Sequence, residues 1–327
     1  LMAVAPNLVS EMKALYGLRS EHEIAVIPNG VDVERFRPVP CEHDRRTEKL
    51  EDSRTEAPDT LEPQKRLRQM LGLSNNSILF GCIGRLDANK NQQLALTAFS
   101  QMQNKPSSSA MVIIGDGPDR ERLMQLAGKL GLNVHDTGSP ASMTRMHKSE
   151  TSSLEHLPLQ PQTKNQEPRT KNIEPGTSNQ EHGTSNQEHG TSNMEHGTSN
   201  MEQRTVPPAF FLGHRDDIPD ILPQLDVLLL PSPPEVLSNV ILEAGACGIS
   251  VIASDIPANR TLVDDGKTGM LLPVDAPHVW AAAMQKHARA PGLRKRLGAK
   301  AREKVCSEYS LDRMAERYAE LYRQAVQ

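Results

Sequence analysis

The sequence lacks long hydrophobic runs. Its longest apolar stretches are only a few residues, whereas a helix needs roughly 20 to span a bilayer. No basic segment followed by a long apolar one opens the sequence, so no secretory leader is predicted. Aromatic residues make up only 3%, and the formal net charge of -4 is small for 327 residues. We therefore expect a soluble, cytoplasmic protein that does not bind nucleic acid.

Metal, redox and common nucleotide motifs are also missing. The four cysteines are scattered without CxxC spacing, at Cys41, Cys82, Cys247 and Cys306. No HExxH or Cys/His cluster indicates zinc, so we expect reduced, structural thiols and no metal site. Neither GxxxxGK[ST] nor a complete GxGxxG signature is present, which disfavours a P-loop or a dehydrogenase. The GDGP at Gly115 is expected to be a turn, and His214 an exposed loop residue.

Two polar segments interrupt the sequence. Residues 140–207 contain few large apolar side chains, and a seven-residue unit, GTSNQEH or a close variant, starts at Gly176, Gly183, Gly190 and Gly197. No position of this low-complexity repeat is consistently apolar, so we expect disorder rather than a coiled coil. Its histidines could hold a metal, but a duplicated DNA unit explains their spacing equally. Residues 39–64 are expected to form a charged surface loop.

Short apolar runs alternate with segments of helical spacing in the rest of the sequence. Strands are expected near 23–31, 77–85, 110–114, 210–212, 227–230 and 250–253. Helices are expected near 1–18, 91–102, 120–130, 218–222, from about 238, and from 278 almost to the end, with a break at Pro291. This alternation predicts an α/β fold, a Rossmann-like doubly wound parallel sheet with helices on both faces.

Two cations follow the strand that is expected to end at Gly84. Arg85 and Lys90 belong to the sequence GRLDANK, in which glycine permits a tight turn before the next helix. A planar guanidinium and a compact ammonium both suit a diphosphate. On their own, two such charges are more often solvated surface groups.

Two carboxylates flank the expected helix start in PSPPEVLSNVILEAG, namely Glu235 and Glu243. Ser238 or Asn239 can cap this helix, which leaves backbone N–H groups around Asn239 and Val240 to face an anion. Glu243, about one turn into the helix, is placed to accept hydrogen bonds from vicinal hydroxyls such as those of a ribose. Strand-to-helix turns of this kind bind ligands in parallel α/β sheets. Alone, the pair could equally be an ordinary loop acid and helix acid.

Together these motifs resemble the C-terminal, donor-binding half of retaining glycosyltransferases of the GT-B fold, in group 1 or family 4. The matching segments, in family order, are VIPNGVDVERFRP, GRLDANKN, IIGDGPDRERL, FLGHRDDIPDIL, PSPPEVLSNVILEAGACG and VDDGKTGMLLP. The resemblance implies that Arg85 and Lys90 hold the diphosphate of a nucleotide sugar, Glu243 the ribose, and Glu235 the hydroxyls of the transferred hexose. It implies no metal or other cofactor, because the cations and the helix amides stabilise the departing diphosphate.

The resemblance also implies a domain organisation. Residues 1–38 would be a remnant of an N-terminal domain with the interdomain linker, and residues 65–139 and 208–327 the two halves of the nucleotide-sugar domain. The acceptor would then be bound by a separate N-terminal domain, with peripheral membrane association, and this chain alone would transfer no sugar. The alternatives are a non-catalytic remnant or split subunit that only binds nucleotide sugar, and an epimerase of related fold. Val236 replaces a glycine usual in the family and is expected to narrow the pocket.

Overall fold

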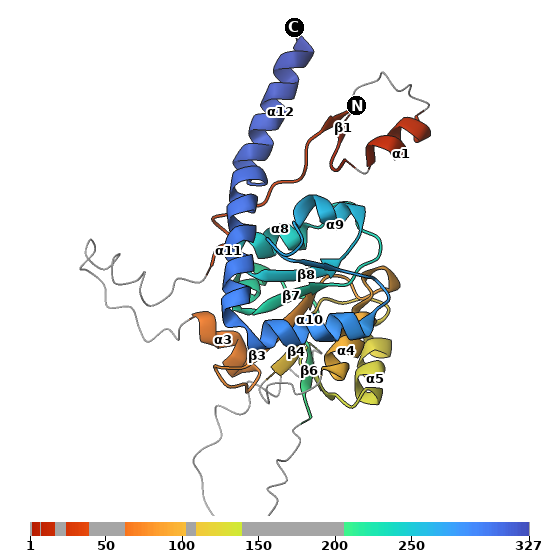
Figure 1. The fold of residues 1–327 in the computed structure, drawn as a ribbon, viewed down its shortest axis with the longest axis vertical. Helices are drawn as coiled ribbons and strands as arrows, with labels where there is room; N and C mark the ends of the chain where they lie inside the picture. Colours follow the sequence, from red (N-terminus) through yellow and green to blue (C-terminus); the bar gives the residue numbers. More distant parts are fainter. Residues whose placement is uncertain are drawn as a thin grey trace, which may run out of the picture. The chain divides into compact units, whose positions relative to one another are not determined.

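The apolar runs form a seven-stranded parallel sheet with helices on both faces (Figure 1). The computed structural model describes residues 2–6, 8–16, 24–38, 63–102, 109–138 and 206–326. The strands are β3 (Ile78–Ile83), β4 (Ser109–Ile114), β5 (Asn133–Asp136), β6 (Pro208–Phe211), β7 (Val227–Leu230), β8 (Ser250–Ser254) and β9 (Met270–Leu272). Their order across the sheet is β5-β6-β4-β3-β7-β8-β9, with every pairing parallel. The predicted α/β, Rossmann-like fold is confirmed.

Successive side chains of the central strands enter two different hydrophobic layers. In β4, Val112 and Ile114 join one layer, while Met111 and Ile113 join the other. A strand buried on both faces needs apolar residues at every position, which explains runs such as VLLL in β7.

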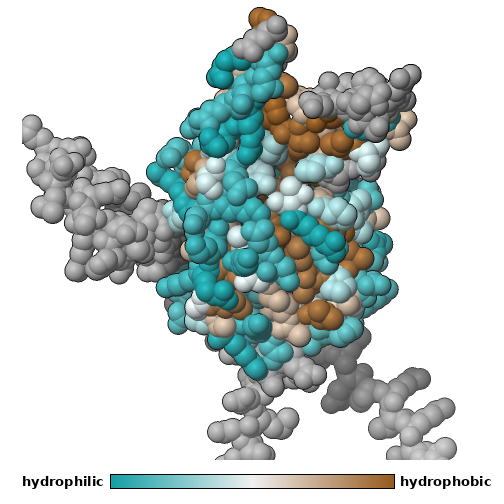
Figure 2. All heavy atoms as spheres, turned by 45° about the horizontal axis from the view of Figure 1, so that its top comes forward, coloured by the Kyte–Doolittle hydropathy of each residue, from teal (hydrophilic) through white to brown (hydrophobic). Residues whose placement is uncertain are grey.

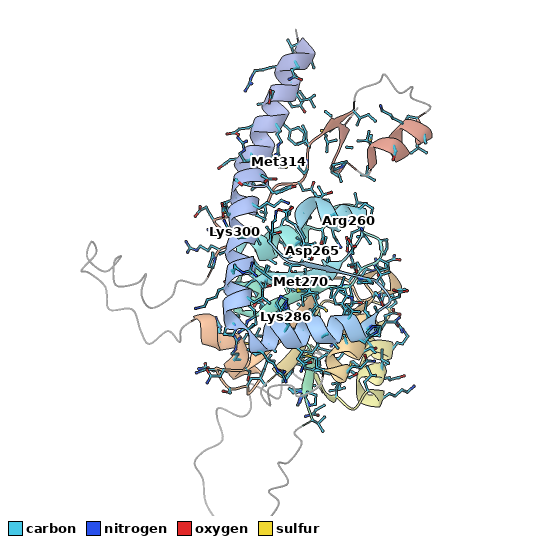
Figure 3. All side chains as sticks on the ribbon, in the orientation of Figure 1. Arg260, Asp265, Met270, Lys286, Lys300 and Met314 are labelled. Atoms are coloured by element: carbon cyan, nitrogen blue, oxygen red, sulfur yellow. The ribbon has the colours of Figure 1, made fainter. Side chains whose placement is uncertain are left out.

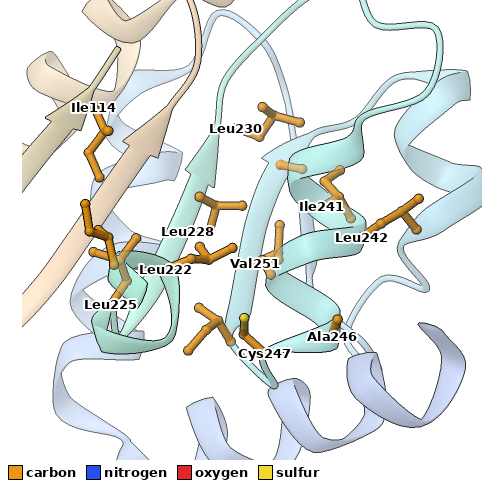
Figure 4. Close-up of a cluster of buried hydrophobic side chains, with 14 of the residues drawn as sticks. Ile114, Leu222, Leu225, Leu228, Leu230, Ile241, Leu242, Ala246, Cys247 and Val251 are labelled. Atoms are coloured by element: carbon orange, nitrogen blue, oxygen red, sulfur yellow. The ribbon is translucent and has the colours of Figure 1, made fainter. Parts of the chain in front are cut away.

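Each layer is completed by its own set of helices. The first contains residues of α3 (Pro63–Met70), α7 (Ile218–Ile221), α8 (Asn239–Ala246), α9 (Pro257–Leu262) and α11 (Pro291–Glu308). The second contains residues of α4 (Gln92–Gln101), α5 (Arg120–Lys129) and α10 (Pro277–Arg289). Figure 4 shows the first layer, where Val251 of the sheet faces α8 and Leu242 projects from the opposite side of that helix. This packing fixes α8 against the sheet.

The small residues that follow Glu243 allow α8 and α11 to pack closely. Gly298 of α11 lies so near the carbonyl oxygen of Gly248 that a Cβ atom there would collide with it. A Cβ at Gly245 would meet the Val305 side chain in the same way. These contacts explain the run of small residues at the end of α8, where the chain packs against α11.

The N-terminal elements differ from the expected helix over residues 1–18. Strand β1 (Met2–Ala3) comes first and pairs in parallel with β2 (Ala25–Val26), and helix α1 spans only Leu8–Leu15. Pro6 explains the late start of α1, because proline disfavours helical backbone in the residue before it.

The C-terminal helical region divides into α10, α11 and α12 (Leu311–Val326), with Pro291 opening α11 as expected. Met314 of α12 lies beside the N-terminal segment, where its Sδ accepts a hydrogen bond from the Gly30 amide at 3.2 Å (Figure 3). Hydrophobic colour gathers along one side of α12 and hydrophilic colour along the other (Figure 2), as in an amphipathic helix. None of the described helices combines the length and apolar character that crossing a bilayer requires.

The remaining predictions about the polar segments lie outside the described residues. These are the charged loop as far as residue 62, and the repeats with their histidines between residues 139 and 205. The proposed domain boundaries therefore stay predictions.

Candidate functional site

The predicted site residues lie on the loops that follow β3 and β7 and in the first turns of α8. These strands are neighbours, with Phe80 beside Val227 and Gly81 beside Leu228. From β3 the chain builds one side of the sheet through β4, and it later adds β7 on the opposite side of β3. The connections therefore leave β3 and β7 in opposite directions, which opens a crevice at their carboxyl ends.

Side chains of the loop after β3 hold that loop in shape. A short 3-10 helix, Ala88–Lys90, is capped by Asp87, whose carboxylate accepts the Asn89 amide at 3.0 Å. The buried Gln92 side chain donates to the Arg85 carbonyl at 2.8 Å. Lys90 therefore lies in a turn that is stabilised by side-chain hydrogen bonds.

Asn91 joins the two loops, a role that the sequence analysis missed. Its side-chain amide donates to the carbonyl oxygens of Pro231, at 3.3 Å, and Val274, at 3.5 Å. Its φ of 49° makes it the one non-glycine residue with positive φ in the part of the chain that the structure describes. Asparagine tolerates this conformation better than most residues, and that preference was the available sequence signal.

The GDGP turn supports the loop after β3 from behind. The Gly84 and Leu86 amides donate to the carbonyl oxygens of Ile114 and Asp116, at 3.0 and 2.9 Å. Gly115 has a φ of 133°, and a Cβ atom there would collide with the Gly84 carbonyl oxygen. The interpretation of GDGP as a turn is therefore confirmed.

Lys90 and Glu235 meet across the crevice. Lys90 Nζ lies 2.5 Å from Glu235 Oε1, in an ion pair between residues 145 positions apart. The Glu235 side chain is only 9% exposed, and that of Lys90 31%. Both line a cavity of about 370 Å³ together with Ile83, Gly84, Ile218, Leu230, Leu237, Ser238, Asn239, Val240 and Glu243.

Helix α8 begins at the wall of this cavity. Ser238 occupies the N-cap position, but its side chain makes no capping hydrogen bond. The Asn239 side chain instead accepts the Asn29 amide group at 3.0 Å. The amides of Asn239 and Val240 belong to the first turn, which has no carbonyl partners within the helix. Together with the helix dipole, they give this wall a positive character.

Glu243 lies one turn further along α8, at the same cavity. Burial raises the pKa of its carboxyl group above the usual range, and the charge of Arg35 opposes this shift only in part. The carboxylate is therefore partly desolvated where it meets the cavity, without an ion-pair partner of its own among the described side chains.

Arg85 faces a second, adjoining cavity instead. Its side chain is 71% exposed, and its Nε lies 3.3 Å from Asp87 Oδ2. This cavity, of about 450 Å³, shares three residues with the first and is lined by Ile83, Gly84, Arg85, Ile114, Gly115, Asp116, His214, Arg215 and Ile218. His214 is 76% exposed, as expected of a loop histidine. The structure thus gathers the other predicted site residues around one cavity and places Arg85 at its neighbour.

Val236 does not narrow the pocket, and that expectation was wrong. Val236 is 45% exposed and is absent from the lining of the two cavities at the site. Its φ is not positive, so the loop passes this position without needing the conformational freedom of glycine.

Two of the described cysteines, Cys82 and Cys247, are buried, structural thiols. Burial raises the pKa of the Cys82 and Cys247 thiols to about 12, which keeps them protonated and unreactive. Within the described ranges, no three or more His, Cys, Asp or Glu side chains come together as metal ligands.

Replacing Asn91 tests the contact between the loops. We expect N91A to lower the free energy of unfolding by about 2 kcal/mol, because alanine loses both amide contacts and disfavours positive φ. N91G loses the same contacts without the conformational penalty, so we expect a loss of about 1 kcal/mol. Urea unfolding of both variants measures the two losses of unfolding free energy. Equal losses would contradict the expected penalty of positive φ for alanine at position 91.

Replacing Glu243 tests its desolvation. A raised folded-state pKa means that stability is greatest below the unfolded pKa of about 4.3 and falls as the pH rises through the folded value. Glutamine does not ionise, so E243Q should melt higher than the parent at pH 7, by on the order of 2 °C. Near pH 4 the two proteins should melt at the same temperature. E303Q removes an exposed glutamate of α11 and is the matched control. A lower melting temperature for E243Q at pH 7 would refute the desolvation.

Known proteins match two parts of this chain. Two family models, both described as glycosyl transferases group 1, match residues 63–144 and 189–289. The D-inositol 3-phosphate glycosyltransferase of Salinispora arenicola is 35% identical over 111 residues, which are 34% of this chain and 25% of that protein. The chain therefore matches only a quarter of that relative's length.

Solved glycosyltransferase structures share the fold. Anabaena HepE in complex with UDP superposes with a TM-score of 0.60 at 18% identity, covering 99% of this chain and 63% of HepE. A glycosyltransferase from Rickettsia africae gives a TM-score of 0.63 at 16% identity, covering 100% of this chain and 63% of that one. These structures show the shared fold. On the matches of the two family models, the chain belongs to the group 1 glycosyltransferases.

Proposed function

We propose that this chain binds a nucleotide sugar and provides the donor site of a hexosyltransferase that retains the anomeric configuration. The observation that carries the proposal is the meeting of Lys90, Glu235 and Glu243 around one cavity at the crevice between β3 and β7. A cation, two carboxylates and a helix N-terminus match the phosphates and hydroxyls of such a donor.

The two adjoining cavities suit the two halves of the donor. We assign the diphosphate to Lys90 and the first-turn amides of α8, with Arg85 reaching it from the neighbouring cavity. Glu243 would accept the ribose hydroxyls. The second cavity, with apolar walls from Ile83, Ile114 and Ile218, would take the planar base.

The same groups would assist departure of the nucleoside diphosphate. As the glycosidic bond breaks, negative charge develops on the diphosphate, and cations and amides already fixed around it stabilise that charge without reorganising. Glu235 would orient the hydroxyls of the sugar and balance the positive charge that develops on it. Retention is proposed from the family resemblance of these motifs.

We place acceptor binding outside the described site. The first relative is about four times as long as its matched part, and this chain covers 63% of HepE. Complete transfer would then require a further domain, either in a longer protein or in a separate subunit, which could also mediate peripheral membrane association. Solved structures of HepE include a complex with UDP-glucose, which supports a nucleotide sugar as the ligand.

Calorimetric titration with UDP-, GDP- and ADP-glucose tests donor binding. We expect at least one to bind, and K90M to weaken that binding by about tenfold or more, because a charge-assisted contact to phosphate is lost. K300M removes a lysine that is 60% exposed on α11, and it should leave the affinity unchanged. Absence of binding to all three sugars would contradict the proposed function.

A further inference from the structure

In the unliganded protein, Glu235 is bound to the Lys90 ammonium group, which is the group that we assign to the diphosphate. Glu235 Oε1 lies 2.5 Å from Lys90 Nζ, well within hydrogen-bond distance. Lys300 and Glu303 of α11 form a pair with the same 2.5 Å separation, but their side chains are 60% and 68% exposed, against 31% and 9% for Lys90 and Glu235 (Figure 3 labels Lys300). Water solvates the groups of the α11 pair if they separate. It reaches Glu235 far less.

We propose that Glu235 makes the site select the intact nucleotide sugar over the nucleoside diphosphate, by competing with the diphosphate for Lys90. This inference rests on the proposed function and adds a role for Glu235 in the unliganded protein. The ion pair is the resting state of the site, and any diphosphate must break it to reach the ammonium group.

Breaking the pair has a different consequence for the two ligands. A nucleoside diphosphate that binds Lys90 leaves the almost buried Glu235 carboxylate without its cation. The carboxylate then also lies near a ligand of the same charge, and both effects are strongly unfavourable. A nucleotide sugar takes Lys90 too, but its sugar hydroxyls donate hydrogen bonds to the abandoned carboxylate. Only the intact nucleotide sugar therefore gives Glu235 hydrogen bonds in place of its lost ion pair with Lys90.

The same asymmetry favours release of the spent nucleotide. Once the sugar has left, nothing donates to Glu235, and the re-forming ion pair displaces the diphosphate from Lys90. Product release is thereby coupled to loss of the sugar without movement of the β3 or β7 backbone.

Calorimetry with matched ligands tests this selection. The ligands are UDP-glucose with UDP, GDP-glucose with GDP, and ADP-glucose with ADP, titrated into the parent chain and E235Q. We expect E235Q to bind the nucleoside diphosphate about tenfold tighter, because Lys90 is free and no charge is left buried. Affinity for the sugar nucleotide should stay equal or fall, so the preference collapses. E303Q changes the net charge equally at the exposed pair and should alter neither affinity.

A second background separates competition for Lys90 from simple repulsion. In K90M the cation is absent, so adding E235Q should raise nucleoside diphosphate affinity by clearly less than in the parent. An equal gain in both backgrounds would overturn the proposal. Thermal melting shows whether E235Q folds. If it does not fold, we expect the same changes in affinity from E235A.

The outcomes distinguish this inference from the proposed function. If the parent binds a sugar nucleotide but E235Q gains no affinity for the diphosphate, the selection mechanism is wrong and the donor site stands. If the parent binds none of the six ligands, the donor site itself is wrong, and the selection mechanism with it.

Discussion

The parallel pairing of β3 with β7 is the constraint on which the site depends. It places two loops that are distant in sequence at one edge of the sheet. Side-chain contacts stabilise the strand pair at both of its ends. At the amino end, Asp226 accepts the Leu79 amide at 2.9 Å and the Arg68 guanidinium at 2.7 Å. At the carboxyl end, Asn91 joins the loops and Lys90 meets Glu235. Small shifts between these strands would therefore disrupt the cavity.

The site itself is not arranged for stability. Glu243 is partly desolvated, Glu235 is almost buried, and the first turn of α8 has no side-chain cap. Each feature opposes folding, and each suits an anionic, hydroxyl-rich ligand. The two hydrophobic layers on either side of the sheet hold these groups in place, a division of roles that is common where a site is preorganised.

Local patterns predicted most of the sheet, because the signal for a strand buried on both faces is its own apolar run. The run Val227–Leu230 was predicted at its observed bounds, and the residues predicted for the site on the loops after β3 and β7 line two adjoining cavities. The short strand Met270–Leu272 was missed, since three residues beside a glycine turn carry little periodicity.

Side-chain direction was the harder problem. Arg85 and Lys90 looked equivalent in sequence, yet Arg85 is drawn toward Asp87 and faces the adjoining cavity, while Lys90 crosses to Glu235. Which way each points depends on partners that are distant in sequence. The structural role of Asn91 was hidden for the same reason, because its two acceptors belong to the loops after β7 and β9. Val236 was misjudged because its exposure follows from the path of the loop, which composition does not report.

A crystal structure of the chain soaked or grown with a nucleotide sugar that it binds would show whether Lys90 and Glu235 exchange each other for the ligand. We expect the Lys90–Glu235 pair to be broken in that structure, with Lys90 Nζ on a diphosphate oxygen and Glu235 accepting a hydrogen bond from a sugar hydroxyl. A donor bound elsewhere, with the Lys90–Glu235 pair intact, would contradict this expectation.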